Sequence, residues 1–296
     1  MKKTQLLFLA MLALIAIALP ATAHNAVLYP GKTETAVGDT VEVTASISEP
    51  LGKPDLPFYT NDATGYNFGP LALAAFKGDS ASDLEISYVD IRDGARKQYS
   101  YEEVAAAFAE QKKNRPDDAA YAVMADVFNS NAVSYKIPSE GTVTFAGACS
   151  YGNVKAFAKT FVNLTADGES TKPRAAHFGF DGIELRPADD LASVKPGQSV
   201  RVEALLGGKP QKGVVVYIGY KGLGESEWLS VLSYSGAGQP AMRASVTGPD
   251  GIAALPLPEI PAGSDALGEV YIFTDGDLEV GGETRYRSTI NFPLKK

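Results

Sequence analysis

The chain has 296 residues, 45% of them hydrophobic and 21% charged, which is enough apolar material to bury the cores of about two domains. Its formal net charge of -8 at pH 7 argues against nucleic acid and anionic membrane surfaces as partners, because both repel an acidic protein. Two histidines and a single cysteine leave little material for nucleophilic or metal-cluster chemistry, so we expect no enzymatic activity.

Residues 1–23 have the three parts of an export signal. Met1-Lys2-Lys3 is basic, residues 6–19 are apolar, and Ala21-Thr22-Ala23 has the small-x-small pattern that signal peptidase accepts. The apolar run is too short for a membrane span, and no later window is long enough. We therefore expect a periplasmic protein without a membrane span after cleavage, whose mature chain begins at His24.

Predicted strands dominate the first part of the mature chain, residues 24–164. Alternation of apolar and polar residues with a period of two, typical of a half-buried strand, is clearest over 40–47 and 84–91. Further strands are expected over 143–145 and 154–164. This part is therefore expected to be a β-sandwich-like domain.

A helical insertion is expected within this domain at about 96–130. Ser100 is a candidate N-cap, with acidic residues in the following turn, for a helix that ends at about Lys112. A second short helix is expected over 117–128, after Pro116.

The polar segment 165–174 is predicted to be a linker, and a second domain is expected over 175–296. Strands separated by glycine and proline turns are predicted in this domain over 182–185, 199–206, 213–220, 243–246, 252–257, 269–274 and 284–292. Seven short strands without helices are typical of an immunoglobulin-like sandwich. The predicted fold class is mainly β, with two tandem immunoglobulin-like β-sandwich domains, the first with a small helical insertion.

A weak internal repeat connects the two predicted domains. Residues 27–30 and 37–43 give a short strand, a proline, a loop closed by a glycine turn and an alternating strand, and residues 183–187 and 195–202 repeat this order. The order is common in β-proteins. The repeat is therefore either coincidental or a sign that both domains begin alike.

The two histidines, each in an Ala-His pair before one copy of the repeat, are the candidate metal ligands: His24 and His177. A terminal histidine offers its α-amine and imidazole Nδ1 to one ion in a six-membered chelate ring, which suits nickel or copper. A metal displaces their protons readily near neutral pH, since the reference pKa values are about 7.7–8.0 and about 6.5. His177 supplies a third nitrogen if the linker brings the two domain starts together. Otherwise His24 is an ordinary terminus and His177 an ordinary linker or core residue.

Other features carry weaker predictions. Cys149 lies in a strand-like run and is predicted to be a small buried hydrophobic residue. Tyr59 and Tyr66, in a loop rich in turn residues, either stack on a sugar or protein partner or close the end of a sandwich. The acidic run at 275–279 resembles part of a calcium loop but fits a hairpin turn better.

Short motifs in both halves resemble a family of extracytoplasmic bacterial domains of poorly defined function, associated with nickel and cobalt uptake transporters of the energy-coupling-factor type. The motifs are the Ala-His start, Leu28-x-Pro30, Val37-Gly38-Asp39-Thr40-Val41-x-Val43, Lys155-Ala156-Phe157-Ala158-Lys159, Ile183-Glu184-Leu185-x-Pro187 and Lys195-Pro196-Gly197. Family members have an aromatic residue shortly after the histidine, where this chain has Asn25-Ala26-Val27. The resemblance implies a periplasmic accessory protein that captures a divalent transition metal (nickel, cobalt or copper) or assists a membrane metal transporter, whose components are its expected partners.

Three functional hypotheses follow from these observations. The first is a periplasmic metal-binding accessory protein that uses His24 and His177. The second is a structural or adhesion module that binds a protein or glycan through sandwich loops. The third, a copper mono-oxygenase built on the terminal histidine, needs a second histidine close to the first and a flat substrate face.

Overall fold

The computed structural model describes thirteen stretches of the chain: residues 25–48, 56–57, 72–91, 96–116, 119, 123, 127–128, 130–151, 154–221, 243–257, 268–274, 278–279 and 284–294. The described strands form three sheets, and we call them sheets A, B and C. In spatial order, sheet A contains β1 (Asn25–Pro30), β2 (Thr40–Ser48), β8 (Ser130–Lys136), β6 (Ser87–Asp90) and β7 (Lys97–Tyr99), with β3 (Leu56–Pro57) beside β2.

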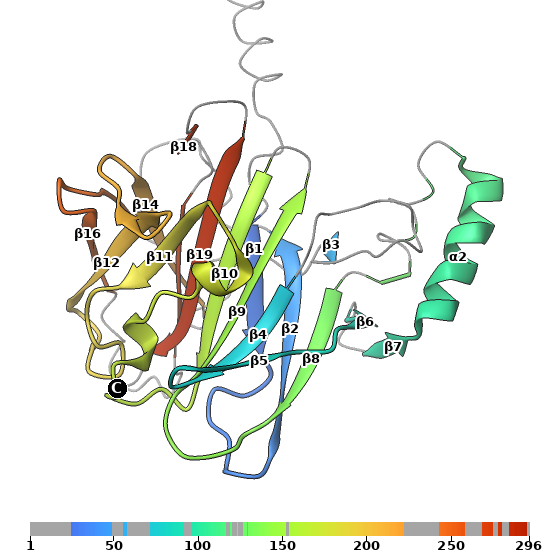
Figure 1. The fold of residues 1–296 in the computed structure, drawn as a ribbon, viewed down its shortest axis with the longest axis horizontal. Coiled ribbons are helices and arrows are strands. Elements are labelled where there is room, and N and C mark those ends of the chain that lie inside the picture. The colour runs from blue at the N-terminus through green and yellow to red at the C-terminus, as the bar shows by residue number, and fades with distance from the viewer. Residues whose placement is uncertain are drawn as a thin grey trace, which may run out of the picture.

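Sheet B is the largest of the three and runs through the middle of the molecule (Figure 1). In spatial order it contains β15 (Arg243–Val246), β14 (Val215–Lys221), β17 (Gly268–Thr274), β19 (Arg285–Leu294), β10 (Val154–Val162), β9 (Val143–Tyr151), β4 (Ala72–Lys77) and β5 (Ser80–Asp83), with β18 (Leu278–Glu279) beside β19. Sheet C contains β11 (Ile183–Pro187), β12 (Ser199–Leu206) and β13 (Lys209–Pro210), with β16 (Ile252–Pro256) paired to β12.

Each half of the chain is a two-layer sandwich with the strand arrangement of an immunoglobulin-like fold. In the first half β1, β2 and β8 form one layer, and β4, β9 and β10 form the other. In the second half β11, β12 and β16 face β14, β17 and β19. Immunoglobulin-like sandwiches place their first, second and fifth strands opposite the third, sixth and seventh, as both halves do here. The predicted fold class is therefore confirmed.

The two halves share one continuous sheet. β10, the last strand of the first sandwich, pairs in parallel with β19, the last strand of the second, from Val154 opposite Arg285 to Thr160 opposite Asn291. The predicted linker 165–174 connects the sandwiches but is itself packed, because it contains η2 (Glu169–Thr171) and buries Arg174. A ladder of hydrogen bonds between β10 and β19 thus joins the sandwiches in addition to the covalent connection.

Sheets A and C cover opposite faces of sheet B. Side chains alternate between the two faces along a strand. On β10, Ala156 and Ala158 belong to the core that faces sheet A, whereas Phe161 belongs to the core that faces sheet C. The neighbouring strand β19 places Ile290 and Phe292 in this second core. The two largest hydrophobic cores of the described residues therefore lie on opposite faces of the shared sheet.

The internal repeat is present in three dimensions, because β1–β2 and β11–β12 are equivalent antiparallel pairs. A proline ends the first strand of each pair and lies opposite a valine of the second strand: Pro30 opposite Val43, and Pro187 opposite Val202. The residue after each proline donates its backbone N–H to the residue before each valine, at 2.8 Å in the first copy and 2.9 Å in the second. The turns before the second strands also match, since Gly38 and Gly197 both have positive φ, 90° and 77°.

The matching register corrects one part of the sequence-based repeat. His24 lies six residues before Pro30, and the residue six positions before Pro187 is Asp181, whereas His177 lies ten residues before Pro187. The 3-10 helix η3 (Ala175–Phe178) contains His177 and precedes β11. The two Ala-His pairs are therefore not equivalent positions of the repeat.

The predicted helix after Ser100 is confirmed as α2 (Tyr101–Asn114), which ends two residues beyond Lys112. The Ser100 side chain accepts from Glu103 N, and the Glu103 carboxylate accepts from Ser100 N, so this capping box satisfies two of the backbone donors left free at the helix start. Of the second expected helix, 117–128, only four residues are described, and Ala119 and Val123 are helical. Among the described residues, no helix combines the length and apolar character that a membrane span needs.

The strand predicted over 84–91 is shorter than expected, and a hairpin beside it was missed. Of residues 84–91, only those of β6 pair within sheet A. The chain crosses from sheet B to sheet A just before β6, since Leu84 N still donates to Leu73 O of sheet B at 3.0 Å. The missed hairpin is β4–β5, whose alanine-rich sequence lacks the apolar and polar alternation that marks a half-buried strand.

Candidate functional site

The first candidate metal ligand is His24, and the described chain begins directly after it. His24 lies outside the described residues, and β1 starts at Asn25. Asn25 pairs with Ser48 of β2 and is only 1% exposed. The second residue after the predicted cleavage position is therefore already part of the first sandwich.

Asn25 also has an unusual side chain for the start of a core strand. Its Nδ2 and Oδ1 are both buried, and neither has a hydrogen-bond partner. The next residues of β1 are apolar and fully packed, with Ala26 and Leu28 in the core below sheet A. The sequence signal for this feature is a polar residue at the head of an apolar strand.

His177 lies at the other candidate position, in η3, on the surface of the first sandwich. Its Nε2 is 3.0 Å from Asp83 Oδ1, and a third of its side chain is exposed. The ring packs edge-on against Phe76 and Phe178, with centroid distances of 5.2 and 4.9 Å. These contacts tie the segment before β11 to the β4–β5 hairpin.

The structure does not bring His177 to the start of β1. Phe76, which His177 contacts, packs with Phe157 on the face of sheet B that lies away from sheet A. β1 belongs to sheet A, on the opposite face. Within the described part of the chain, no three His, Cys, Asp or Glu side chains come together as a metal site.

Cys149 is buried in the first core with a free thiol, in agreement with the sequence-based interpretation. Burial raises the pKa of the thiol far above its usual range, so the reactive thiolate is not available near neutral pH. We expect a thiol reagent such as dithionitrobenzoate to leave the native protein unmodified and to react with one thiol per chain in denaturant. Rapid reaction of the folded protein at pH 8 would contradict this assignment.

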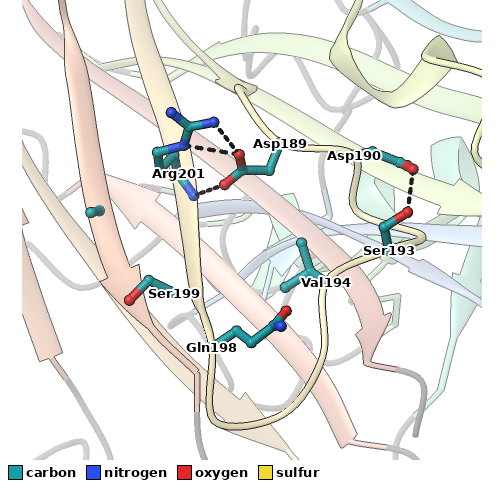
Figure 2. A pocket seen from close by; sticks show the side chains of 8 residues that line it. Asp189, Asp190, Ser193, Val194, Gln198, Ser199 and Arg201 are labelled. Carbon is teal, nitrogen blue, oxygen red and sulfur yellow. Dashed lines mark hydrogen bonds and ion pairs between the residues drawn. The ribbon is translucent and has the colours of Figure 1, made fainter.

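An open hollow of about 430 Å³ lies on the second sandwich, beside the loop between β11 and β12 (Figure 2). Its acidic groups are already engaged. Asp189 accepts from Arg201 N, Nε and Nη2 at 2.7, 2.9 and 2.6 Å, and Asp190 accepts from Ser193 Oγ and Ala192 N at 2.6 and 3.1 Å. These carboxylates hold the loop in place, so the hollow offers no cluster of free oxygen ligands.

The sequence analysis missed a buried ion pair that joins the two halves. Lys159 Nζ of β10 lies 2.5 Å from Glu184 Oε1 of β11, and their side chains are 0% and 4% exposed. The Glu184 carboxylate also accepts from the backbone N–H groups of Arg174 and Ala175 at 2.7 and 2.9 Å. Burial lowers the pKa of Lys159, and the Glu184 charge opposes that shift. Lys159 and two backbone N–H groups are the partners of the Glu184 carboxylate, so we assign the pair a structural role.

The remaining sequence candidates are not placed by the structure. Tyr59 and Tyr66 lie outside the described residues, as does the acidic run except for its last two positions, which form β18. No position for a stacking ligand or a calcium ion is therefore assigned to them.

Comparison with solved structures gives only distant likenesses. The chain is similar to the D0-D1 domain of intimin, at 13% identity over 90% of this chain and 97% of that one, with a TM-score of 0.23. It is similar to the Yersinia pseudotuberculosis adhesin InvE at 13% identity, over 92% of this chain and 59% of that one, with a TM-score of 0.22. The mouse nectin-like molecule 4 ectodomain follows at 7% identity, over 93% and 66%, with a TM-score of 0.23. TM-scores this low do not establish a shared fold, so the fold is assigned from the strand order of the two sandwiches.

None of the curated proteins matches the sequence. A family model does match it, over residues 21–260, which is most of the chain. The chain belongs to the family described as Domain of unknown function (DUF4198).

Proposed function

We propose that the mature chain is a periplasmic binding protein that captures a divalent transition metal ion, nickel, cobalt or copper, through its processed N-terminus and serves a membrane metal transporter. The observation that supports this most is the start of the fold at Asn25, directly after the predicted terminal residue His24. Cleavage after Ala23 would leave a single residue before the first strand of the fold.

The donor set of this terminus suits the proposed ions. An α-amine and an imidazole nitrogen are the donors that Cu(II) and Ni(II) prefer, and neither needs a cysteine or a carboxylate cluster. Thiolate chemistry has no role in this proposal, since Cys149 is buried in the first core. His177 is excluded from the proposed site because it lies on the far face of sheet B and already contacts Asp83.

Replacing His24 with alanine tests the proposal. Mature chain beginning at His24 is expected to bind one equivalent of Ni²⁺ or Cu²⁺ in isothermal titration calorimetry. The His24→Ala protein keeps the α-amine but has no imidazole beside it, so the chelate ring cannot form. We expect this change to weaken binding by about a hundredfold or more, since even the loss of an outer-sphere partner costs about 10–100-fold.

His177→Ala is the matched control for this experiment, because it removes the second histidine and leaves the terminus intact. Its affinity for Ni²⁺ and Cu²⁺ is expected to equal that of the unchanged chain. Equal binding by the His24→Ala and parent proteins would rule out the terminal chelate. A large loss in His177→Ala would instead revive the shared site of His24 and His177.

A structural or adhesion module is the second candidate, and the shared sheet favours it. The parallel ladder between β10 and β19 holds the two sandwiches in one fixed relation, as a spacer or docking module requires. This candidate expects unchanged metal uptake in a His24→Ala strain. It also expects loss of protein or glycan binding when Tyr59 or Tyr66 is replaced.

A further inference from the structure

The hollow beside the β11–β12 loop (Figure 2) has the dimensions of a small-molecule site. Its volume of about 430 Å³ lies within the range of ligand pockets, about 300–1,000 Å³. Val194 and Ala254 give it an apolar part, and its other lining residues are polar or charged. Such a combination of apolar surface with a few fixed polar groups is typical of sites that orient a small ligand.

The loop that lines the hollow is held in one shape by its own contacts. The Ser193 backbone N–H donates to Asp190 O at 3.0 Å, and the Ser193 hydroxyl donates to Asp190 Oδ2 at 2.6 Å. Leu191 and Val194, 2% and 8% exposed, anchor the loop in the second core. The polar groups of the lining are therefore in place before a ligand arrives, which lowers the entropy cost of binding.

This arrangement is particular to the second copy of the repeat. The loop between the proline and the turn glycine covers residues 188–196 there and only 31–37 in the first copy, two residues fewer. Arg201 and Glu42 are equivalent, since each backbone carbonyl accepts from the residue after the proline. Glu42 forms its ion pair outside the first loop, whereas Arg201 pairs with Asp189 of the longer second loop. The sandwich fold does not itself require the arrangement that lines the hollow.

The lining offers hydrogen-bond donors and acceptors together. A guanidinium has five N–H donors, and the Asp189 carboxylate takes up two of those of Arg201, at Nε and Nη2. The Arg201 side chain is 57% exposed, so its other N–H groups are open to a ligand. Gln198 and Ser199 are exposed and add an amide and a hydroxyl. Each Asp190 oxygen accepts one hydrogen bond from the loop and keeps a second lone pair as an acceptor.

The charges of the lining favour a neutral ligand. Asp189, Asp190 and Arg201 give a net charge of -1, which disfavours a phosphate or carboxylate ligand. Both carboxylates are bonded to the chain, so they are poor ligands for a cation. A sugar hydroxyl both donates and accepts hydrogen bonds, which matches the mixed lining. We propose that this hollow binds a neutral sugar residue, at a site separate from the terminal chelate.

Amide NMR spectra of the mature chain, recorded during titration with glucose, galactose, mannose and N-acetylglucosamine, test this inference. At least one sugar is expected to shift the signals of residues 189–201 with a Kd of about 1–10 mM, because a monosaccharide in an open hollow makes few contacts. Calcium chloride, sodium phosphate and triglycine at the same concentrations are expected to leave these signals in place.

Three variants connect the shifts to the hollow. Ala254→Leu places a larger side chain in it without removing a hydrogen bond, and is expected to abolish binding. Ala244→Leu, at an exposed alanine of β15 outside the hollow, is the matched control and is expected to keep the parental Kd. Ser199→Ala removes one hydroxyl and is expected to weaken binding about two- to tenfold, the effect of a single hydrogen bond.

The outcomes separate the sugar site from the proposed function. No movement of the loop signals with any of the four sugars, or equal binding by the parent and Ala254→Leu proteins, would overturn the site. Larger shifts with calcium, phosphate or triglycine than with any sugar would overturn the ligand class. The terminal chelate is tested independently, by metal titration of the His24→Ala protein.

Discussion

Replacing Lys159 with methionine is expected to lower the free energy of unfolding by about 3–5 kcal/mol, the usual cost of removing one partner of a buried ion pair. Methionine has a similar length but no charge, so the Glu184 carboxylate would stay buried with only its two backbone donors. Guanidinium unfolding followed by far-ultraviolet circular dichroism measures the change. The effect is large because both side chains are almost fully removed from water.

The same strand offers a matched control in Lys155. Its ammonium lies 2.8 Å from Asp181, but the two side chains are 38% and 66% exposed, and exposed pairs contribute about 0–1 kcal/mol. Lys155→Met is therefore expected to change stability by about 1 kcal/mol or less. Combining Lys159→Met with Glu184→Gln removes the unpaired buried charge and keeps an acceptor for one of the two backbone donors, so it is expected to recover part of the loss. A Lys159→Met protein as stable as the parent would show that the pair does not hold the halves together.

Ending the chain at residue 260, where the family match ends, is expected to abolish folding. This truncation removes β17 and β19, which lie between β14 and β10 in sheet B. Val270, Ile272, Ile290 and Phe292 leave the second core with these strands. Burial of each is worth about 1.5–3 kcal/mol, so their sum approaches the whole stability of a typical domain, about 5–15 kcal/mol.

A fragment of residues 24–260 tests this expectation against the full mature chain, 24–296. The fragment is expected to show no cooperative thermal transition and poorly dispersed amide resonances. A sharp transition would mean that the first sandwich folds without the parallel strand β19. The experiment therefore measures whether the shared sheet makes the two sandwiches one folding unit.

Much of the local structure could be predicted from the sequence. The strand over 199–206 has the predicted bounds, and the capping sequence at Ser100 located the start of α2. The repeat was visible as a proline and a glycine turn at matching places, and the structure gives both copies the same register. These features depend on periodicity and turn chemistry within short windows, which a single sequence contains.

The candidate site was predicted only in part. The sequence singled out the residue next to Asn25, but burial of an asparagine without a partner depends on what packs over the strand. The sequence predicts a site shared by His24 and His177 only if the two domain starts lie together, and the backbone register shows that the two Ala-His pairs are not equivalent. Spacing along the chain carries no information about which face of a sheet a segment covers.

The sequence by itself determined the mainly β class, the two sandwiches and most strand positions, because alternation and turn residues act locally. Only the tertiary structure decided that β10 pairs in parallel with β19, that the two cores lie on opposite faces of one sheet, and that Lys159 is buried. Lys155 and Lys159 lie four residues apart on one face of β10, but Lys159 is buried because β11 packs over it. The pairing of β10 with β19 joins strands more than a hundred residues apart, which leaves no local pattern in the sequence.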